Sequence, residues 1–371
     1  MLVTFLGFTS FCLTLAALPS WAVRGGVSPG VAGSVTTVML LSTVGTQLLL
    51  PRALRRWGTA RVLAAGLLTL GAPAPLLALS HDLALLLPVS AVRGTGFAVL
   101  TVVGSLLTTV VAPEDRHGEA VGLYGLAIAV PNLLGVPVGV ALTQGGSFWA
   151  VGVLGAAPVL GVPAALTLGR GHRSVPAPSA PPAPAPAAGG RRTVLRAMWA
   201  PTAVLGAATL AAGGLVTFLP ILLSSGSSTA VVALLLFGLT SAVSRWRVGA
   251  LVDRFGLSLL LPGSVVASVV GTAAVAAGLH TGSHGLVLAG SCLFGAGYGA
   301  VLNATLVVAF SRAGTAGATT ASSLWTAAFD SGTAVGAFLL GALVTAGLAA
   351  PAAFLVTAGL MLATLLVVPR R

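Results

Sequence analysis

The sequence predicts an all-α, polytopic membrane protein with 12 transmembrane helices in two pseudo-symmetric six-helix bundles. Of its 371 residues, 56% are hydrophobic and only 6% are charged, whereas soluble domains carry about 25% charged residues. The mean hydropathy is +1.05. These values exclude a soluble enzyme, a disordered chain and a secreted disulfide scaffold, and they indicate that lipid is the main solvent.

Twelve apolar stretches are long enough to cross a bilayer, which takes about 20 mostly apolar residues per helix. Each stretch is continuously apolar rather than alternating, so helices are expected and a β-barrel is not. The expected spans are residues 2–22, 30–54, 61–80, 84–112, 119–143, 147–168, 199–223, 229–248, 257–279, 283–310, 316–346 and 348–369.

Basic residues lie almost entirely on one side of these spans. All 18 are arginines, and all but two lie in connections after even-numbered spans or at the C-terminus. Arg24 lies on the opposite side and Arg93 lies within a span. Because positive charge marks the cytoplasmic side, a multi-pass cell-membrane protein with both termini in the cytoplasm is expected. The same placement accounts for the net charge of +12 without nucleic acid as a partner.

Residues 169–198 interrupt the apolar pattern. The stretch from Ser174 to Gly190 is rich in Pro and Ala and is flanked by arginines. Such a segment cannot bury apolar area, so we expect a flexible cytoplasmic linker. It would separate an N-terminal six-helix bundle, residues 1–168, from a C-terminal bundle, residues 199–371.

The two halves resemble each other weakly. Spans 4 and 5 align with spans 10 and 11 at a constant offset of 201, and Arg56-Trp57-Gly58 corresponds to Arg254-Phe255-Gly256. The matched glycines in the spans are Gly94 with Gly295, Gly96 with Gly297 and Gly135 with Gly336. Two related bundles joined by a linker are typical of transporters.

The most specific motif follows span 8, where Gly249 to Gly256 reads G-A-L-V-D-R-F-G. Its glycines permit a tight turn, and Asp253, which precedes Arg254, can accept hydrogen bonds from a helix N-terminus or pair with an arginine. Arg312, in the symmetry-related loop, is the candidate partner. The pattern resembles the loop signature of the major facilitator superfamily. It would act as a cytoplasmic gating latch between bundles or, alternatively, form a turn whose charges face the cytosol.

The first-half copy, from Pro51 to Gly58, departs from this signature. Pro51 replaces the expected glycine and Arg55 replaces the expected aspartate, which puts the usual latch of this half in doubt. We expect Arg55 or Arg56 to pair with acidic residues of the connection between spans 4 and 5.

Span 4 contains Arg93-Gly94-Thr-Gly96, which resembles the span-4 motif of the same family, an arginine before a glycine pair. A charge within lipid is costly, so Arg93 should face a cavity or a partner. The alternative is that its side chain extends to the outer surface.

Span 5 resembles the Gly/Pro-rich motif of the antiporter branch of the family. The glycines allow close helix approach and the prolines bend the helix. Simple close packing and a role in coupling both remain open, and the resemblance favours efflux. The motif residues are Pro131, Asn132, Gly135, Pro137 and Gly139.

Asp330 is the only acidic residue in the middle of a span, and it shares a helix face with Ser322, Thr326 and Thr333. A buried carboxyl is protonated more readily than an exposed one, so Asp330 is the first candidate for proton coupling. The alternative is a structural ion pair or a hydrogen bond to span 2 near Gln47. Further polar residues that could line a cavity, or join helices, are Gln47, Thr101, Tyr298, Asn303 and Thr326.

The resemblance covers essentially the whole chain, and within the family it is most similar to bacterial sugar-efflux and drug-efflux permeases. It implies alternating access around a central site, with proton-coupled export of a small amphipathic, drug-like or sugar-like molecule by a monomer. A proton symporter or facilitator that imports a solute is the alternative, and a non-transporting receptor or scaffold is the rival from another class. No nucleotide-binding, catalytic or zinc motif is present, so no enzyme, cofactor or metal site is predicted.

Overall fold

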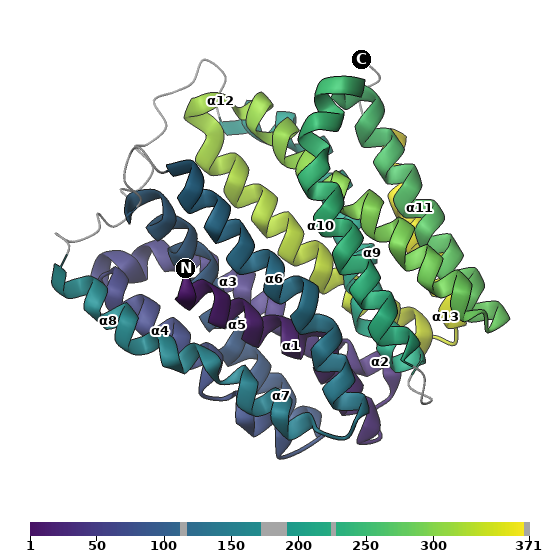
Figure 1. Cartoon of the computed structure of the whole chain (residues 1–371), viewed down its shortest axis with the longest axis horizontal. Coiled ribbons are helices and arrows are strands. Elements are labelled where there is room, and N and C mark those ends of the chain that lie inside the picture. Colours follow the sequence, from purple (N-terminus) through teal and green to yellow (C-terminus); the bar gives the residue numbers. More distant parts are fainter. Residues whose placement is uncertain (112–116, 172–190, 224–227, 367–371) are drawn as a thin grey trace. The chain divides into compact units, whose positions relative to one another are not determined.

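The computed structural model describes the backbone of residues 1–111, 117–171, 191–223 and 228–366. Side chains are described for the same residues except 108–111, 117–122, 168–171, 191–197, 249–250, 253, 255 and 313–320. All regular elements in these ranges are helices (Figure 1). The chain divides into two compact units, residues 1–180 with 220–226 (unit 1) and residues 181–219 with 227–371 (unit 2).

Unit 1 holds the first six expected spans, and prolines interrupt two of them. Pro73 separates α4 from a 3-10 helix, and Pro158 lies within a second 3-10 helix, because proline removes a backbone donor and disfavours a continuous α-helix. The elements are α1 (Leu2–Arg24), α2 (Pro29–Ala32), α3 (Ser34–Trp57), α4 (Thr59–Gly71), η1 (Ala74–Ala78), α5 (Leu83–Val111), α6 (His117–Gln144), α7 (Phe148–Gly155), η3 (Ala157–Gly161) and α8 (Val162–Gly171).

Unit 2 contains the remaining expected spans, except for the last residues of span 7, from Pro220, which belong to unit 1. Its elements are α9 (Arg191–Leu222), α10 (Thr229–Phe255), α11 (Leu257–Thr281), α12 (His284–Thr345), α13 (Ala350–Ala363) and η4 (Thr364–Leu366). Helices α8 and α9 extend into both ends of the predicted linker 169–198, whose middle, 172–190, lies outside the described residues.

Helix α12 folds back on itself. Its 62 residues would extend for about 93 Å if straight, against about 30 Å for the hydrocarbon core of a bilayer. The Trp325 indole donates to the Thr305 hydroxyl at 3.2 Å, and Ala309 packs with Ala321, so the two arms lie side by side and meet near the α12 label in Figure 1. The sequence predicts two helices here, and the backbone stays helical between them.

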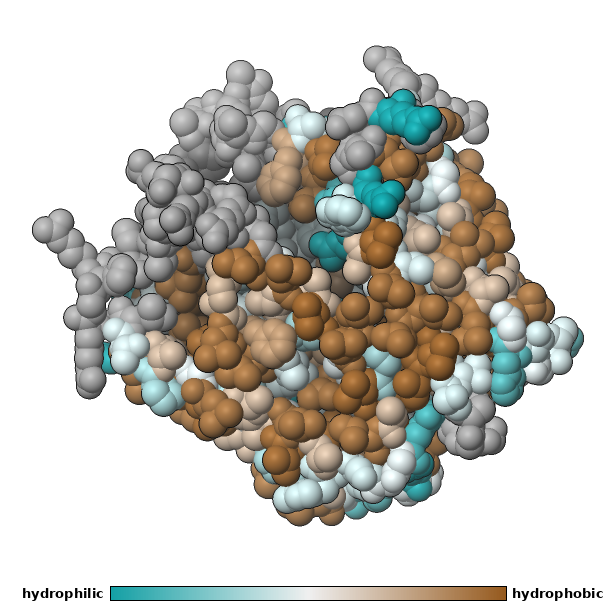
Figure 2. All heavy atoms as spheres, viewed as in Figure 1, coloured by the Kyte–Doolittle hydropathy of each residue, from teal (hydrophilic) through white to brown (hydrophobic). Residues whose placement is uncertain are grey.

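Eleven helices in the described residues are long and apolar enough to cross a membrane. The twelfth expected span is the shorter apolar run Ala350–Leu366, near the lower limit of about 17 residues for a spanning helix. Figure 2 shows apolar side chains over most of the visible face. Three exposed tryptophans, Trp57, Trp199 and Trp246, lie near the arginine-rich helix ends, and a fourth, Trp149, lies at the start of α7. Tryptophans of this kind are typical of the interfacial belts of membrane proteins.

The two units repeat the same helix contacts. Spans 2 and 3 are joined by Gly58 alone and spans 8 and 9 by Gly256 alone, with φ of 78° and 75°. A Cβ on Gly96 would overlap the Gly66 carbonyl, and one on Gly297 would approach the Ser264 carbonyl to 2.6 Å. The predicted correspondence of these segments therefore agrees with the structure, at offsets of 198 for α3, α4, α10 and α11 and 201 for α5 and the first arm of α12.

The contacts of span 5 follow two offsets. A Cβ on Gly104 would approach the Tyr124 ring to 3.4 Å, and at the predicted offset of 201 their counterparts Thr305 and Trp325 share a hydrogen bond. A Cβ on Gly139 would overlap the Leu13 carbonyl of α1, and one on Gly336 would overlap the Leu210 carbonyl of α9. The glycine contacts with α1 and α9 therefore repeat at an offset of 197, with Gly139 equivalent to Gly336. The predicted pairing of Gly135 with Gly336 is displaced by one helical turn in these contacts.

Candidate functional site

Arg93 lies fully buried inside unit 1, with no solvent exposure. Its Nε donates to the Leu70 carbonyl at 3.0 Å, and its Nη2 donates to the Ser10 hydroxyl at 3.0 Å and the Ser10 carbonyl at 3.2 Å. Leu70 is in the last turn of α4, which ends at Gly71, so its carbonyl would otherwise lack a helical donor. Arg93 thus caps a broken span, and a cation suits the negative end of a helix dipole.

Ser10 extends this contact to a third helix. Its hydroxyl accepts from Arg93 and donates to the Gly155 carbonyl at the end of α7. The Nη1 of Arg93 and the nearby Ser90 hydroxyl have no hydrogen-bond partner among the described residues. The position equivalent to Arg93 in unit 2 is Phe294, also fully buried, so the polar cluster belongs to unit 1.

Asp330 lies in the second arm of α12 and is 4% exposed. The flanking residues pack closely on α9, because a Cβ on Gly332 would overlap the Thr209 hydroxyl and one on Gly336 would overlap the Leu210 carbonyl. The unit 1 residues that correspond to Asp330 at the offsets of 201 and 197 are Ala129 and Leu133, both apolar. The acidic side chain is therefore a feature of unit 2.

The hydroxyls beside Asp330 are bonded within their own helix. Thr326 donates to the Ser322 carbonyl at 3.0 Å and Thr333 to the Phe329 carbonyl at 2.9 Å. Both threonines are partly exposed, whereas Asp330 is buried. The predicted polar stripe is thus present on α12, with its one acidic group held deepest.

The other predicted polar residues take separate positions. Asn303 donates to the Arg245 carbonyl of α10 at 2.9 Å, so it joins two helices. Tyr298 is buried against Phe237, with ring centroids 5.5 Å apart. Thr101 bonds the Ala98 carbonyl of its own helix at 3.0 Å. Gln47 lies half-buried on α3.

The span-5 motif forms the contact of α6 with α1. A Cβ on Gly135 would lie 2.9 Å from the Cys12 Cβ, and the Gly139 contact with Leu13 is closer still. Helix α6 continues through both prolines, Pro131 and Pro137, which lie buried within it. The exposed Asn132 side chain donates to the Ile128 carbonyl at 3.0 Å, satisfying a carbonyl near the proline.

The structure describes only part of the predicted gating loop. Gly249 and Asp253 lie within α10, and their side chains are outside the described residues. Arg254 and Arg312 are exposed at the ends of α10 and of the first α12 arm. In the first half, Arg55 is exposed and the Arg56 guanidinium lies 5.8 Å from the centre of the Trp57 ring.

A cluster at the opposite end of unit 1 was not predicted. The Arg24 guanidinium donates to the carbonyls of Thr143 and Gln144 at the end of α6. Trp21 stacks on Phe148 at 4.3 Å, and its indole donates to the Ser80 carbonyl. The sequence held one signal for this cluster, since Arg24 is the only arginine predicted on that side.

This architecture is shared with a known family of proteins. The sequence matches the Major Facilitator Superfamily over residues 1–337, and no curated protein matches it significantly. The structure resembles a POT family transporter in complex with 5-aminolevulinic acid, with a TM-score of 0.76, 13% identity and coverage of 99% of this chain and 94% of that one.

Two other solved structures share the fold. The nucleoside transporter NupG matches with a TM-score of 0.73, 16% identity and coverage of 98% of this chain and 96% of that one. A bacterial homologue of the human lysosomal transporter Spinster, in an inward-facing conformation, matches with a TM-score of 0.64, 15% identity and coverage of 98% and 93%. The family match covers most of the chain and agrees with the helical fold, so the protein is a multi-pass membrane transporter that belongs to the Major Facilitator Superfamily.

Proposed function

We propose that this protein exports a small amphipathic molecule across the cell membrane in exchange for protons, by alternating access. Asp330 carries the proposal because it is a buried acidic group in the middle of a span, and intramembrane carboxyls commonly serve as proton relays. Protonation of Asp330 and binding of the substrate would alternate. The close α1–α6 contact at Gly135 and Gly139 resembles the antiporter motif and favours export.

The arrangement in the membrane is part of the same proposal. Residues 1–168 and 199–371 would form two bundles that rock about a central site, with the linker and both termini in the cytoplasm. The cluster of arginines after the even-numbered spans supports this orientation. The protein would work as a monomer, and Asp253 would latch the cytoplasmic ends through Arg312.

Arg93 takes a supporting part in the proposal. Its three hydrogen bonds join α5 to α4 and α1 within unit 1. A guanidinium enclosed in this way is suited to hold one bundle rigid while the other moves against it. We therefore assign substrate and proton exchange to the Asp330 face of unit 2 rather than to Arg93.

The test has two stages. A compound panel of dyes, antibiotics and sugars is first screened for reduced accumulation in cells that lack their own exporters. The compound found is then assayed in proteoliposomes with an imposed pH gradient and an internal pH dye. Wild-type protein is expected to couple efflux to proton entry, and Asp330→Asn to lose this coupling.

A matched control is Asp82→Asn, because Asp82 is an exposed residue before α5 that interacts with Ser80. Its variant is expected to transport as the wild type does. Full proton-coupled transport by Asp330→Asn would overturn the assignment. Accumulation of the compound in the direction of proton flow would instead identify a symporter.

A further inference from the structure

Arg245 lies within a membrane-spanning helix rather than in the connection that the charge pattern assigns to it. Helix α10 continues to Phe255, and its spanning part, Thr229–Val248, includes Arg245 one turn before its end. An arginine at such a position can extend to the membrane surface. The alternative is that the charge stays inside the span, where it needs a partner or a water-filled path.

The first arm of α12 sets the depth of Arg245. A Cβ on Gly299 would overlap the Ser241 carbonyl, and four residues further along both helices the Asn303 side chain donates to the Arg245 carbonyl at 2.9 Å. The two helices therefore run parallel, side by side. Asn303 lies about 14 Å along the helix axis before Arg312, where the spanning part of this arm ends. The backbone of Arg245 is thus inside the span.

The side chain of Arg245 is directed further into the span. The Cα–Cβ bonds of a helix tilt toward its N-terminus, which for α10 is the end at Thr229 and not the arginine-rich end. The guanidinium interacts electrostatically with the Tyr298 hydroxyl, and Tyr298 precedes Asn303 by more than one turn on the inward side. Arg245 is exposed, and no acidic side chain among the described residues forms an ion pair with it.

Aromatic side chains lie beside this cation. Phe237, Phe294 and Tyr298 form a cluster whose ring centroids are 5.5 to 5.8 Å apart, and Phe237 is partly exposed. A guanidinium binds a carboxylate through two parallel hydrogen bonds, and aromatic side chains offer apolar contact area to the rest of such a ligand. The combination favours an amphipathic molecule with one acidic group.

The charged group is particular to unit 2. At the offsets of 198 and 201, the counterparts of Arg245, Tyr298 and Asn303 in unit 1 are Gln47, Phe97 and Val102. None of these is charged, and only the first is polar. The internal repeat therefore does not account for an arginine at this place.

Arg245 and Asp330 lie at similar depths in unit 2. The two arms of α12 are antiparallel and meet where Trp325 donates to Thr305. Asp330 is five residues beyond Trp325, which corresponds to a place five residues before Thr305 in the first arm, between Tyr298 and Asn303. A ligand held by Arg245 would therefore lie near the depth of the candidate proton-exchanging group.

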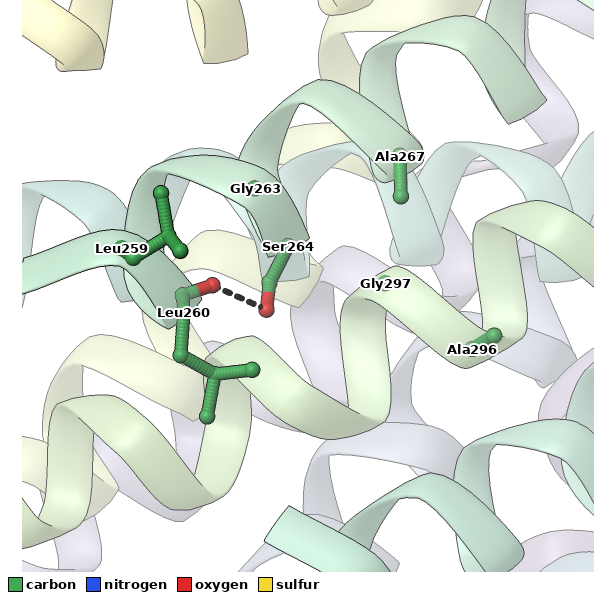
Figure 3. Close-up of a pocket in the computed structure, with 7 residues that line it drawn as sticks. All are labelled: Leu259, Leu260, Gly263, Ser264, Ala267, Ala296 and Gly297. Atoms are coloured by element: carbon green, nitrogen blue, oxygen red, sulfur yellow. Dashed lines mark hydrogen bonds between the residues drawn. The ribbon is translucent and has the colours of Figure 1, made fainter. Parts of the chain in front are cut away.

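A small groove between α11 and the first arm of α12 offers no comparable group. It has a volume of about 270 Å³, and its lining is apolar except for Ser264, whose hydroxyl donates to the Leu260 carbonyl at 2.6 Å (Figure 3). An acidic ligand would find neither a cation nor an unpaired side-chain donor among these lining residues.

We propose that the exported molecule is an organic acid and that Arg245 binds its carboxylate, with the Tyr298 hydroxyl and the Phe237 ring beside it. This inference rests on the export function proposed above and names the chemical class of the molecule exported. Arg245 is thereby assigned to substrate binding and Asp330 to proton exchange.

Isothermal titration calorimetry of the purified full chain at neutral pH tests the proposal. The probes are matched pairs: benzoate and benzamide, salicylate and salicylamide, and cinnamate and cinnamamide. The members of a pair share a ring and differ in charge, because carboxylic acids are ionised at neutral pH. Wild-type protein is expected to bind at least one acid about tenfold more tightly than its amide, as a charged hydrogen-bond partner allows. Arg245→Gln, which introduces the unit 1 residue, should abolish this preference, and Arg245→Lys should keep most of it.

Arg247→Gln is the matched control, because Arg247 is exposed and its guanidinium lies 5.2 Å from the centre of the Trp246 ring. This variant should keep the preference for the acid. Tyr298→Phe should weaken acid binding about fivefold and leave amide binding unchanged. Equal binding of acid and amide in every pair, or a preference that Arg245→Gln retains, would overturn the proposal.

The outcome is separable from that of the proposed export. Binding is measured without a proton gradient, so the preference for an acid does not depend on coupling. Proton-coupled export by a protein that prefers no acid would reject only the role of Arg245. Preference for an acid together with full proton coupling in Asp330→Asn would reject only the role of Asp330.

Discussion

Gly58 and Gly256 adopt nearly the same backbone conformation, with φ and ψ of 78° and 158° at the first and 75° and 153° at the second. Each is the single residue between two membrane helices, and its N–H bonds the carbonyl four residues earlier. This region of backbone space is open essentially to glycine alone. The two turns are the clearest structural mark of the internal repeat.

Alanine at either turn is expected to destabilise the protein. Gly58→Ala and Gly256→Ala force a side chain into a conformation that costs about 1–3 kcal/mol, so thermal unfolding in detergent should occur at a lower temperature. Gly45→Ala is the control, because Gly45 lies in α3 with nothing within 4 Å of the added Cβ. Equal unfolding temperatures for all three variants would contradict the assigned strain.

Replacing Arg93 by methionine should lower stability. The change removes the donors to the Leu70 carbonyl and to both Ser10 acceptors, and a buried polar group left unpaired costs about 1–3 kcal/mol. Thermal unfolding of Arg93→Met and Arg93→Lys measures the effect, with lysine expected to recover part of the loss. A methionine variant as stable as the wild type would show that these bonds contribute nothing net.

The α1–α6 and α9–α12 contacts should not tolerate a methyl group. Gly139→Ala and Gly336→Ala place a Cβ on the carbonyls of Leu13 and Leu210, and such overpacking costs about 1–3 kcal/mol. The fraction of monodisperse protein after purification measures the effect. Gly125→Ala, in α6 with open space around it, should behave as the wild type. Normal yields of both contact variants would argue against the close approach.

The proposed cytoplasmic latch predicts a charge-reversal rescue. Asp253→Arg should reduce transport at least tenfold, and the double variant Asp253→Arg/Arg312→Asp should restore much of it, because the pair would attract again with its signs exchanged. Arg55→Asp, at the position where the first half departs from the signature, serves as the comparison. If the double variant transports no better than Asp253→Arg alone, then Asp253 and Arg312 do not pair.

The sequence predicted the helices well because each long apolar run needs a spanning helix to satisfy its backbone. It predicted the correspondence of Gly58 with Gly256 for a similar reason, since few other residues suit a one-residue turn. The burial of Asp330 also followed, because a charged residue in the middle of a span is disfavoured at a lipid surface.

The partners of Arg93 could not be predicted because they are mostly backbone carbonyls. The Leu70 carbonyl lacks a donor within its own helix only because α4 breaks before Pro73. Backbone acceptors of this kind leave no recognisable pattern of residue types in the sequence. The pairing of the span-5 glycines failed for another reason. Glycines recur at four-residue spacing in both copies, so a pairing shifted by one turn scores nearly as well, and only the contacts with Leu13 and Leu210 decide it.

The central claim is that the Asp330 face lines an aqueous path that opens to each side of the membrane in turn. The water accessibility of this face tests it most directly. Thr326→Cys and Thr333→Cys are introduced after Cys12 and Cys292 are replaced, and a membrane-impermeant thiol reagent is applied from each side at high and low pH. The account predicts labelling from both sides, with the favoured side changing when Asp330 can be protonated and the pH effect lost in Asp330→Asn. Absence of labelling from either side at every pH would contradict an aqueous, alternately accessible path.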